Sequence, residues 1–78
     1  MEYAFKSDYG EEYIGDLLHK IQDKTKASAK LISRVRSSPR SAVHNCVVRI
    51  TPADSDSFRW PELEADDAVV FSELVKIP

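Results

Sequence analysis

The longest periodic segment of the chain is EEYIGDLLHKIQDKTKASAKLISRVR, residues 11–36. Its apolar residues recur at steps of three and four, which is the period of an amphipathic helix. The residues that form this apolar face are Ile14, Leu17, Leu18, Ile21, Ile32 and Val35. Thr25 and Ser28 interrupt the face, and Gly15 costs about 1 kcal/mol relative to alanine inside a helix. The segment is either one helix or two helices with a break near Thr25, and we expect one continuous or slightly kinked helix.

Strand patterns flank this segment on both sides. Residues 2–6 alternate aromatic and polar side chains, which indicates a short half-buried strand. Asp8 and Glu11 have the spacing of a capping box, so we expect the helix to begin there. Pro39 ends the helix, because proline and the residue before it are disfavoured in a helix interior. Residues 43–50 follow as a strand rich in β-branched side chains. One face of that strand carries His44, Cys46, Val48 and Ile50.

The C-terminal third of the chain allows two interpretations. We expect residues 53–57 to form a polar turn, and residues 58–60 to form a short extended piece that ends at Pro61. Residues 62–67 are acidic and are either helix or loop. Residues 68–77 fit a strand by their alternation, or a helix opened by Pro61. Their β-branched residues favour the strand.

These patterns predict one small α+β domain over residues 1–78. Its expected architecture is one long amphipathic helix packed on a small, mostly antiparallel sheet, in the order β-α-β-β. A chain of 78 residues, 42% of them hydrophobic and 31% charged, is long enough for one core. Such a core rarely supplies more than about 3 to 5 kcal/mol of stability, so a homodimer is a further way to complete it.

Cysteine usage and the N-terminal residues bear on the compartment. Cys46 is the only cysteine, so no intrachain disulfide can form and a reducing compartment is indicated. The first residues have neither the basic nor the apolar region of a leader, and no run approaches the roughly 18 apolar residues of a membrane span. We therefore expect a cytoplasmic protein without a membrane partner.

Charge is arranged along the chain in three blocks. Residues 19–50 carry eight Lys and Arg side chains and a single acid, Asp23. Residues 1–18 and 51–78 are both acidic, and the whole chain has a formal net charge of -2. Blocks of one sign indicate surfaces that meet partners of the opposite sign.

No catalytic or metal-binding pattern emerges from the sequence. A metal or nucleophile site would have to use His19, His44 and Cys46, which lack the spacing of a complete ligand set. Cys46 is therefore interpreted as a small buried hydrophobe. With only Gly10 and Gly15, the chain also lacks a glycine-rich phosphate loop. We expect no enzyme activity, no cofactor and no metal.

The leading hypothesis is a small non-enzymatic interaction protein, such as an inhibitor, antitoxin or accessory regulator, that docks charged surfaces onto a protein partner. The alternative is a nucleic-acid-binding regulator that uses the basic segment Lys20 to Arg40. On a continuous helix, Lys26, Lys30 and Arg34 would form one basic stripe. The sequence pI of about 5.6 and the lack of RNP-like aromatics count against nucleic acid. The residues expected to contact a partner are Lys26, Lys30, Arg34, Arg36, Arg40, Phe58, Trp60, Asp66 and Asp67.

Overall fold

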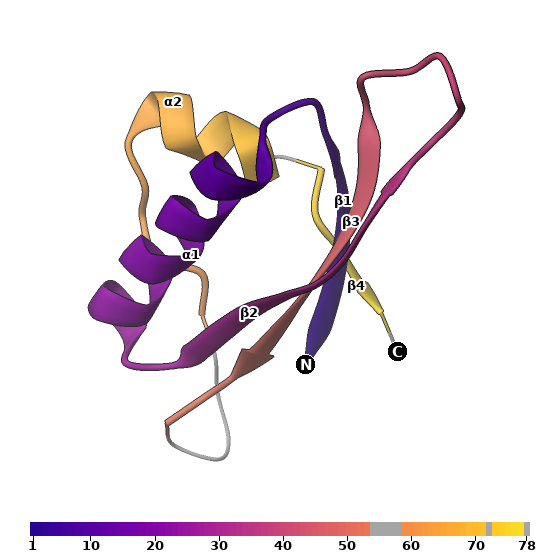
Figure 1. Cartoon of the computed structure of the whole chain (residues 1–78). Coiled ribbons are helices and arrows are strands. Elements are labelled where there is room, and N and C mark those ends of the chain that lie inside the picture. The colour runs from indigo at the N-terminus through magenta and orange to yellow at the C-terminus, as the bar shows by residue number, and fades with distance from the viewer. Residues whose placement is uncertain (54–58, 72, 78) are drawn as a thin grey trace.

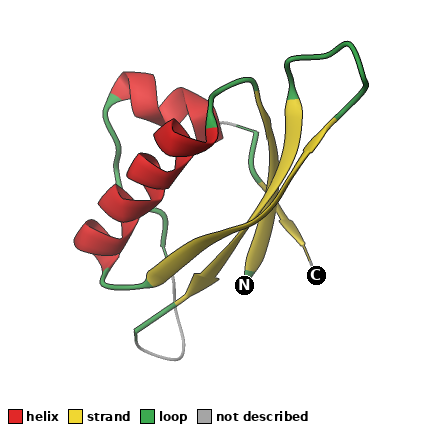
Figure 2. Cartoon of the chain, viewed as in Figure 1, coloured by secondary structure: helices red, strands yellow, loops and turns green. Residues whose placement is uncertain are grey.

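The computed structural model describes residues 1–53, 59–71 and 73–77. Two helices and a four-stranded antiparallel sheet make up a small α+β fold (Figure 1, Figure 2). The elements in chain order are β1 (Glu2–Ser7), α1 (Glu11–Thr25), β2 (Ser28–Arg36), β3 (His44–Thr51), α2 (Ala65–Ala68), the 3-10 turn η1 (Val69–Phe71) and β4 (Val75–Ile77). Both helices lie on one side of the sheet, so no described helix covers its other face (Figure 1).

The strand order is β2-β3-β1-β4, and every neighbouring pair is antiparallel. It follows that β1 and β2 are parallel with β3 between them, and that β3 and β4 are parallel with β1 between them. This is the split β-α-β arrangement of ferredoxin-like folds, here with a second helix of only four residues. Proteins of many functions share such an arrangement, so it does not by itself indicate a function.

The prediction of a helix over residues 11–36 is wrong beyond Thr25. α1 has 15 residues, and Lys26 then adopts a left-handed conformation with a φ of 62°. The N–H of Lys26 donates to the Gln22 carbonyl oxygen at 2.8 Å, and the Thr25 hydroxyl donates to the Ile21 carbonyl oxygen at 2.6 Å. These bonds satisfy carbonyls that a helix end leaves without partners. A break near Thr25 is confirmed, but the residues after it form a strand.

That strand, β2, pairs with β3 from Ser28 to Arg36. Ala29 lies opposite Ile50, and Leu31 lies opposite Val48. These side chains face α1 and either belong to the core or pack against it. Hydrogen bonds to β3 satisfy backbone N–H and C=O groups of β2. In the predicted helix, these groups would have bonded to one another.

A β-bulge divides β2 into two halves. The register shifts between Leu31 and Ser33, so Ile32 is an extra residue without a directly opposed partner. The shift reverses the alternation of side chains. Arg34 lies opposite buried Cys46 on the helix side of the sheet, whereas Val35 lies on the other face.

The N-terminal predictions are confirmed in outline. The strands expected over residues 2–6 and 43–50 are present as β1 and β3. The helix begins at Glu11 as expected. Its N-cap is Gly10, which has no side chain that could cap the helix, so the capping box predicted from Asp8 is wrong.

The C-terminal region combines the two interpretations of the sequence. Residues 65–71 are helical, so the strand predicted over residues 68–77 is wrong for its first part and confirmed only for residues 75–77. The α+β class and the antiparallel sheet are confirmed. The helix is shorter than predicted, and the order β-α-β-β omits the last helix and strand.

One hydrophobic core lies between the sheet and the helices. Its buried members are Tyr3, Phe5, Ile14, Leu17, Leu18, Ile21, Ala27, Ala29, Cys46, Val48, Ile50 and Val70. Every strand from β1 to β3 and each helical segment except α2 contributes to it. Within the described residues, no helix is both long and apolar enough to span a bilayer.

Candidate interaction surfaces

The basic residues of the predicted stripe do not share a helix. Lys26 caps the C-terminal end of α1, and Lys30, Arg34 and Arg36 belong to β2. Arg40 lies in the loop that joins β2 to β3. Lys30 and Arg36 are six residues apart along β2, which at about 3.3 Å per residue separates them by about 20 Å. The predicted contacts from Lys26 to Arg40 therefore follow a helix end, an edge strand and a hairpin loop instead of one helix face.

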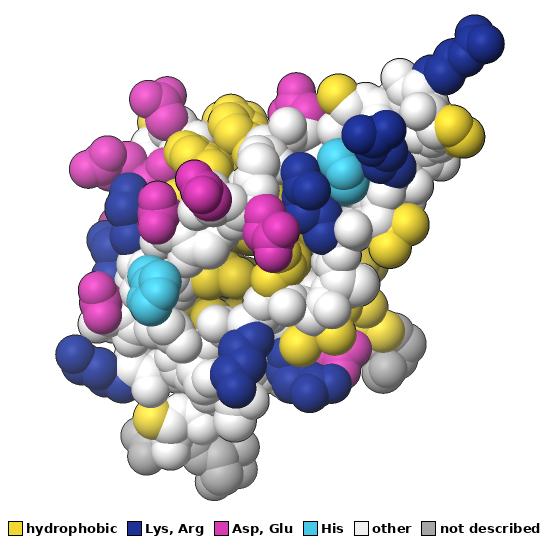
Figure 3. Space-filling model, viewed as in Figure 1, with side chains coloured by type: hydrophobic (Ala, Val, Ile, Leu, Met, Phe, Trp, Pro, Cys, Tyr) yellow, Lys and Arg dark blue, Asp and Glu magenta, His cyan; other side chains and the backbone are white. Residues whose placement is uncertain are grey.

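The end of this hairpin forms what we call the basic arm, defined as Arg34, Arg36, Arg40 and the loop 37–43. It extends beyond the helices and the other strands (Figure 1), and dark blue side chains follow it to its tip (Figure 3). Arg36 donates to the Pro39 carbonyl oxygen at 3.5 Å, and Arg34 donates to the Tyr9 carbonyl oxygen at 3.2 Å. Among the described residues, no carboxylate forms an ion pair with any of the three arginines.

The face of the sheet that carries no helix has an aliphatic centre. Ala4 lies between Val47 of β3 and Val75 of β4. Val35 and Val75 are 62% and 64% exposed. The described strand residues on this face include no aromatic side chain. Aromatic rings are one means by which a sheet stacks nucleic-acid bases.

His44 and Cys46 do not form a reactive pair. The Cys46 side chain is 1% exposed, and burial raises the pKa of its thiol more than the nearby Arg34 charge lowers it. The thiol lies 3.8 Å from the carbonyl oxygen of His44, whereas the His44 ring nitrogen Nδ1 lies 3.0 Å from the Ala42 carbonyl oxygen. A protonated thiol out of reach of a base is a poor nucleophile. Among the described residues, no three His, Cys, Asp or Glu side chains gather as a metal site.

Asp67 connects the acidic C-terminal segment to α1. Its carboxylate accepts a hydrogen bond from the Tyr13 hydroxyl at 2.9 Å and one from the Lys20 ammonium at 2.8 Å. The bonds from Lys20 and Tyr13 lower the pKa of Asp67, and they raise the pKa values of both donors. Asp67 is 7% exposed, whereas Asp66 beside it is exposed. Of these two predicted partner contacts, Asp67 therefore holds α2 against α1, and only Asp66 faces solvent.

We expect the Asp67→Asn variant to unfold at a lower urea concentration than the wild type at pH 7, because both hydrogen bonds lose a charged acceptor. The folded-state pKa of Asp67 lies below its unfolded value, so its stabilisation is present at neutral pH. It is lost as the pH falls below about 4 and through the folded-state pKa. The urea midpoints of the wild type and Asp67→Asn should therefore converge below about pH 4. Asp66→Asn is the matched control and should leave the midpoint unchanged. A difference that stays constant from neutral to acidic pH would contradict this account.

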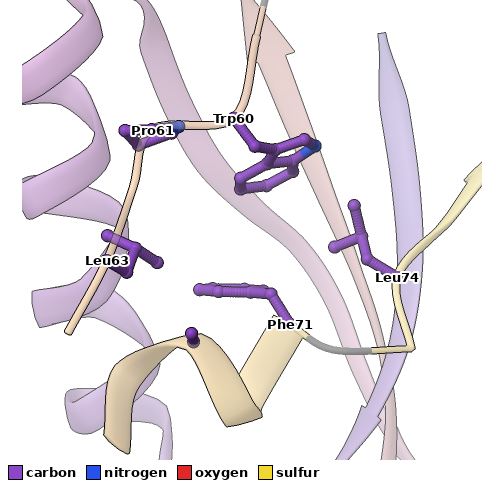
Figure 4. A pocket seen from close by; sticks show the side chains of 6 residues that line it. Trp60, Pro61, Leu63, Phe71 and Leu74 are labelled. Carbon is purple, nitrogen blue, oxygen red and sulfur yellow. The ribbon is translucent and has the colours of Figure 1, made fainter. Parts of the chain in front are cut away.

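Trp60 packs at the border of the core, and the predicted contact Phe58 lies outside the described residues. The Trp60 ring meets Tyr3 edge to face at 5.2 Å between centroids and Phe71 at 5.4 Å. Beside it is a hollow of about 330 Å³, into which Trp60 and Phe71 project (Figure 4). The other lining residues are Pro61, Leu63, Ala68 and Leu74. Trp60 thus connects residues 59–63 to the sheet.

The sequence did not predict a groove that lies between α1 and β2. The groove encloses about 440 Å³. It is lined by Glu11, Gly15, Leu18, His19 and Gln22 of α1 and by Ala29, Lys30 and Leu31 of β2. The sequence pattern predicted a helix for the β2 residues that form its second wall. The sequence feature that could have pointed to the groove was Gly15 inside α1.

Comparison with protein-family models, with curated proteins and with solved structures found no match to this chain.

Proposed function

We propose that this protein is a non-catalytic interaction protein, in the class of inhibitors, antitoxins or accessory regulators, whose basic arm docks onto an acidic surface of a partner protein. The observation that carries the proposal is the state of Arg34, Arg36 and Arg40. They lie on a projecting hairpin, and no described carboxylate neutralises them. Guanidinium groups bind carboxylates with two parallel hydrogen bonds, and they attract acidic partners over a distance.

The charges outside the arm support a directed encounter. The Lys20 ammonium is bound to Asp67, and Lys24 donates to the Glu62 carbonyl oxygen at 3.2 Å. Asp67 of the acidic segment therefore neutralises Lys20 of α1, whereas no described carboxylate pairs with an arginine of the arm. A molecule with one uncompensated basic end and acidic residues elsewhere orients itself in the field of an acidic partner.

Nucleic acid is the second candidate, and one observation favours it. No acid occurs between Asp23 and Asp54, and the loop of the arm contains Ser37, Ser38 and Ser41, whose hydroxyls can bind phosphate oxygens. Two features favour protein instead. The net charge of -2 opposes a polyanion. The described strand residues on the face without helices include aliphatic side chains and no aromatic ring for base stacking.

The test uses three baits in a pull-down from a lysate of the source organism, each with and without nuclease. The baits are the wild type, Arg36→Glu/Arg40→Glu, and the control Lys6→Glu/Lys76→Glu, which changes the net charge by the same amount at exposed positions. We expect a protein that wild type and control retain after nuclease treatment and that the arm variant loses. With that protein purified, reversal of both arginines should weaken binding by about 30-fold or more.

Two results would contradict the proposal. Capture that nuclease abolishes would assign the arm to nucleic acid, and that binding should weaken steeply with salt. Equal capture of the same proteins by all three baits would show that the arm does not select a partner.

A further inference from the structure

The groove between α1 and β2 is an open channel with an apolar floor. Figure 3 shows yellow side chains at the bottom of a hollow between these two elements. Leu18 is buried beneath it, and Leu31 is partly buried. Lys30 and His19 are exposed on opposite walls. The hollow is open to solvent, so it is a surface groove and not an interior cavity.

The strand wall of the groove is the unpaired side of an edge strand. β2 is the outermost strand, and among the described strands only β3 pairs with it. The backbone N–H and C=O of Ile50 both bond to Met1, at 2.8 and 2.9 Å, so they point toward β1. In an antiparallel ladder the residue opposite, Ala29, then directs its own backbone groups away from β3. Two residues later and before the bulge, Leu31 does the same.

At Ala29, a side chain already accepts the hydrogen bond that a neighbouring strand would accept. The Ala29 N–H donates to Gln22 Oε1 of α1 at 3.0 Å. This bond independently shows that the Ala29 N–H points into the groove. The Ala29 N–H can therefore donate to a carbonyl oxygen placed in the groove. The N–H and C=O of Leu31 point in the same direction.

Gly15 has no side chain that would fill the groove from the side of α1. Glycine in a helix interior is unfavourable relative to alanine. A Cβ placed at Gly15 would meet nothing within 4 Å, so packing inside this chain does not require the glycine. The space that it leaves open lies in the groove. Glycine is the residue that permits a backbone to approach closely.

We propose that this groove binds an extended segment of a partner protein, which adds to the edge of β2 opposite residues 29–31. The backbone edge favours an extended chain, because a strand that displaces the Gln22 side chain can satisfy the N–H and C=O groups of Ala29 and Leu31 together. The bulge at Ile32 ends the regular edge, so the paired segment is about three residues long.

Alternation along the added strand defines its chemistry. A residue beside Leu31 or Ala29 directs its side chain into the hollow, so it is aliphatic. The residue between them directs its side chain to the face that carries Lys30 and Arg49, which are opposite each other in the sheet. Glu2 pairs with Arg49, whereas Lys30 has no ion-pair partner among the described residues. The expected segment is therefore aliphatic-acidic-aliphatic. This inference goes beyond the proposed function, because the groove and the basic arm are different surfaces.

The experiment is a selection of displayed random heptapeptides on the immobilised full chain, followed by binding measurements with synthetic copies of the enriched peptides. Gly15→Leu fills the groove, and Glu12→Leu is the control at an exposed position of the same helix. We expect peptides with the aliphatic-acidic-aliphatic pattern, which bind Gly15→Leu about 10-fold or more weakly and bind Glu12→Leu and Arg36→Glu/Arg40→Glu unchanged. Methylation of the backbone nitrogens opposite Leu31 should abolish binding.

The stability of Gly15→Leu separates this role from a structural one. Leucine is a better helix former than glycine, so the variant should melt at a higher temperature while it binds more weakly. The proposal is overturned if no enriched peptide depends on Gly15, or if methylated peptides bind as well as unmethylated ones. It is equally overturned if light scattering shows a dimer that Gly15→Leu dissociates, because a second copy would then occupy the groove.

Discussion

Replacement of Ile21 by alanine is expected to unfold most of the molecules at 25 °C. Ile21 is 0% exposed and lies in the core between α1 and the sheet. Loss of a buried isoleucine to alanine costs about 2 to 5 kcal/mol, through lost burial and the cavity that remains. A domain of this size with one core and no disulfide or metal rarely has more than about 3 to 5 kcal/mol in total. Far-UV circular dichroism and urea titration at pH 7 measure the outcome.

The matched control for this prediction is Val35→Ala. Val35 is 62% exposed on the uncovered face of the sheet, so its truncation should change stability by no more than about 0.5 kcal/mol. If Ile21→Ala keeps a wild-type urea midpoint, or if both variants lose the same stability, the core described above does not hold the fold together.

The strands β1 and β3 and the buried face of α1 could be predicted because each has one clear pattern. Tyr3 and Phe5 alternate with more exposed residues in β1, and Cys46, Val48 and Ile50 do so in β3. The predicted apolar face of α1 is buried at all four of its positions up to Ile21. In these segments the local pattern and the tertiary pairing favour the same structure.

Residues 26–36 could not be assigned from local pattern, because they fit two periods. Ile32 and Val35 continue the helical spacing of the preceding residues, whereas Ala29 and Leu31 fit a strand. The strand forms because β3, which follows later in the chain, pairs with it. The usual signal for a helix end, a glycine in the left-handed conformation, is replaced here by Lys26. The bulge at Ile32 depends on pairing as well.

For the candidate sites, too, the sequence predicted features that depend on neighbouring residues and missed those that depend on contacts between distant residues. The charge blocks identified the basic residues of the arm, but not their geometry. The contacts of Asp67 with Tyr13 and Lys20 span 54 and 47 residues of sequence, so no local pattern predicts which acid is buried. The groove has α1 and β2 as separate walls, so a single helix over residues 11–36 would not form it.

Aromatic contacts attach the C-terminal segment to the sheet. Phe5 and Phe71 meet edge to face at 5.1 Å, and Trp60 contacts both Phe71 and Tyr3. Trp60 and Phe71 therefore tie residues 59–71 to the aromatic side of β1. Aromatic pairs of this geometry contribute about 0.5 to 1.5 kcal/mol each beyond the area they bury.

Trp60→Ala is expected to lower the free energy of unfolding by about 3 kcal/mol, at the low end for a tryptophan because the side chain is only partly buried. That loss approaches the total stability of the domain, and it removes two ring contacts at once. Trp60→Phe keeps a ring in the same position, so it should retain most of the stability. Urea titration by circular dichroism measures both variants, and amide hydrogen exchange should accelerate over residues 65–71 in Trp60→Ala alone. If Trp60→Ala and Trp60→Phe unfold together at the wild-type midpoint, the segment does not depend on this ring, and its attachment must come from Asp67 and Val70 instead.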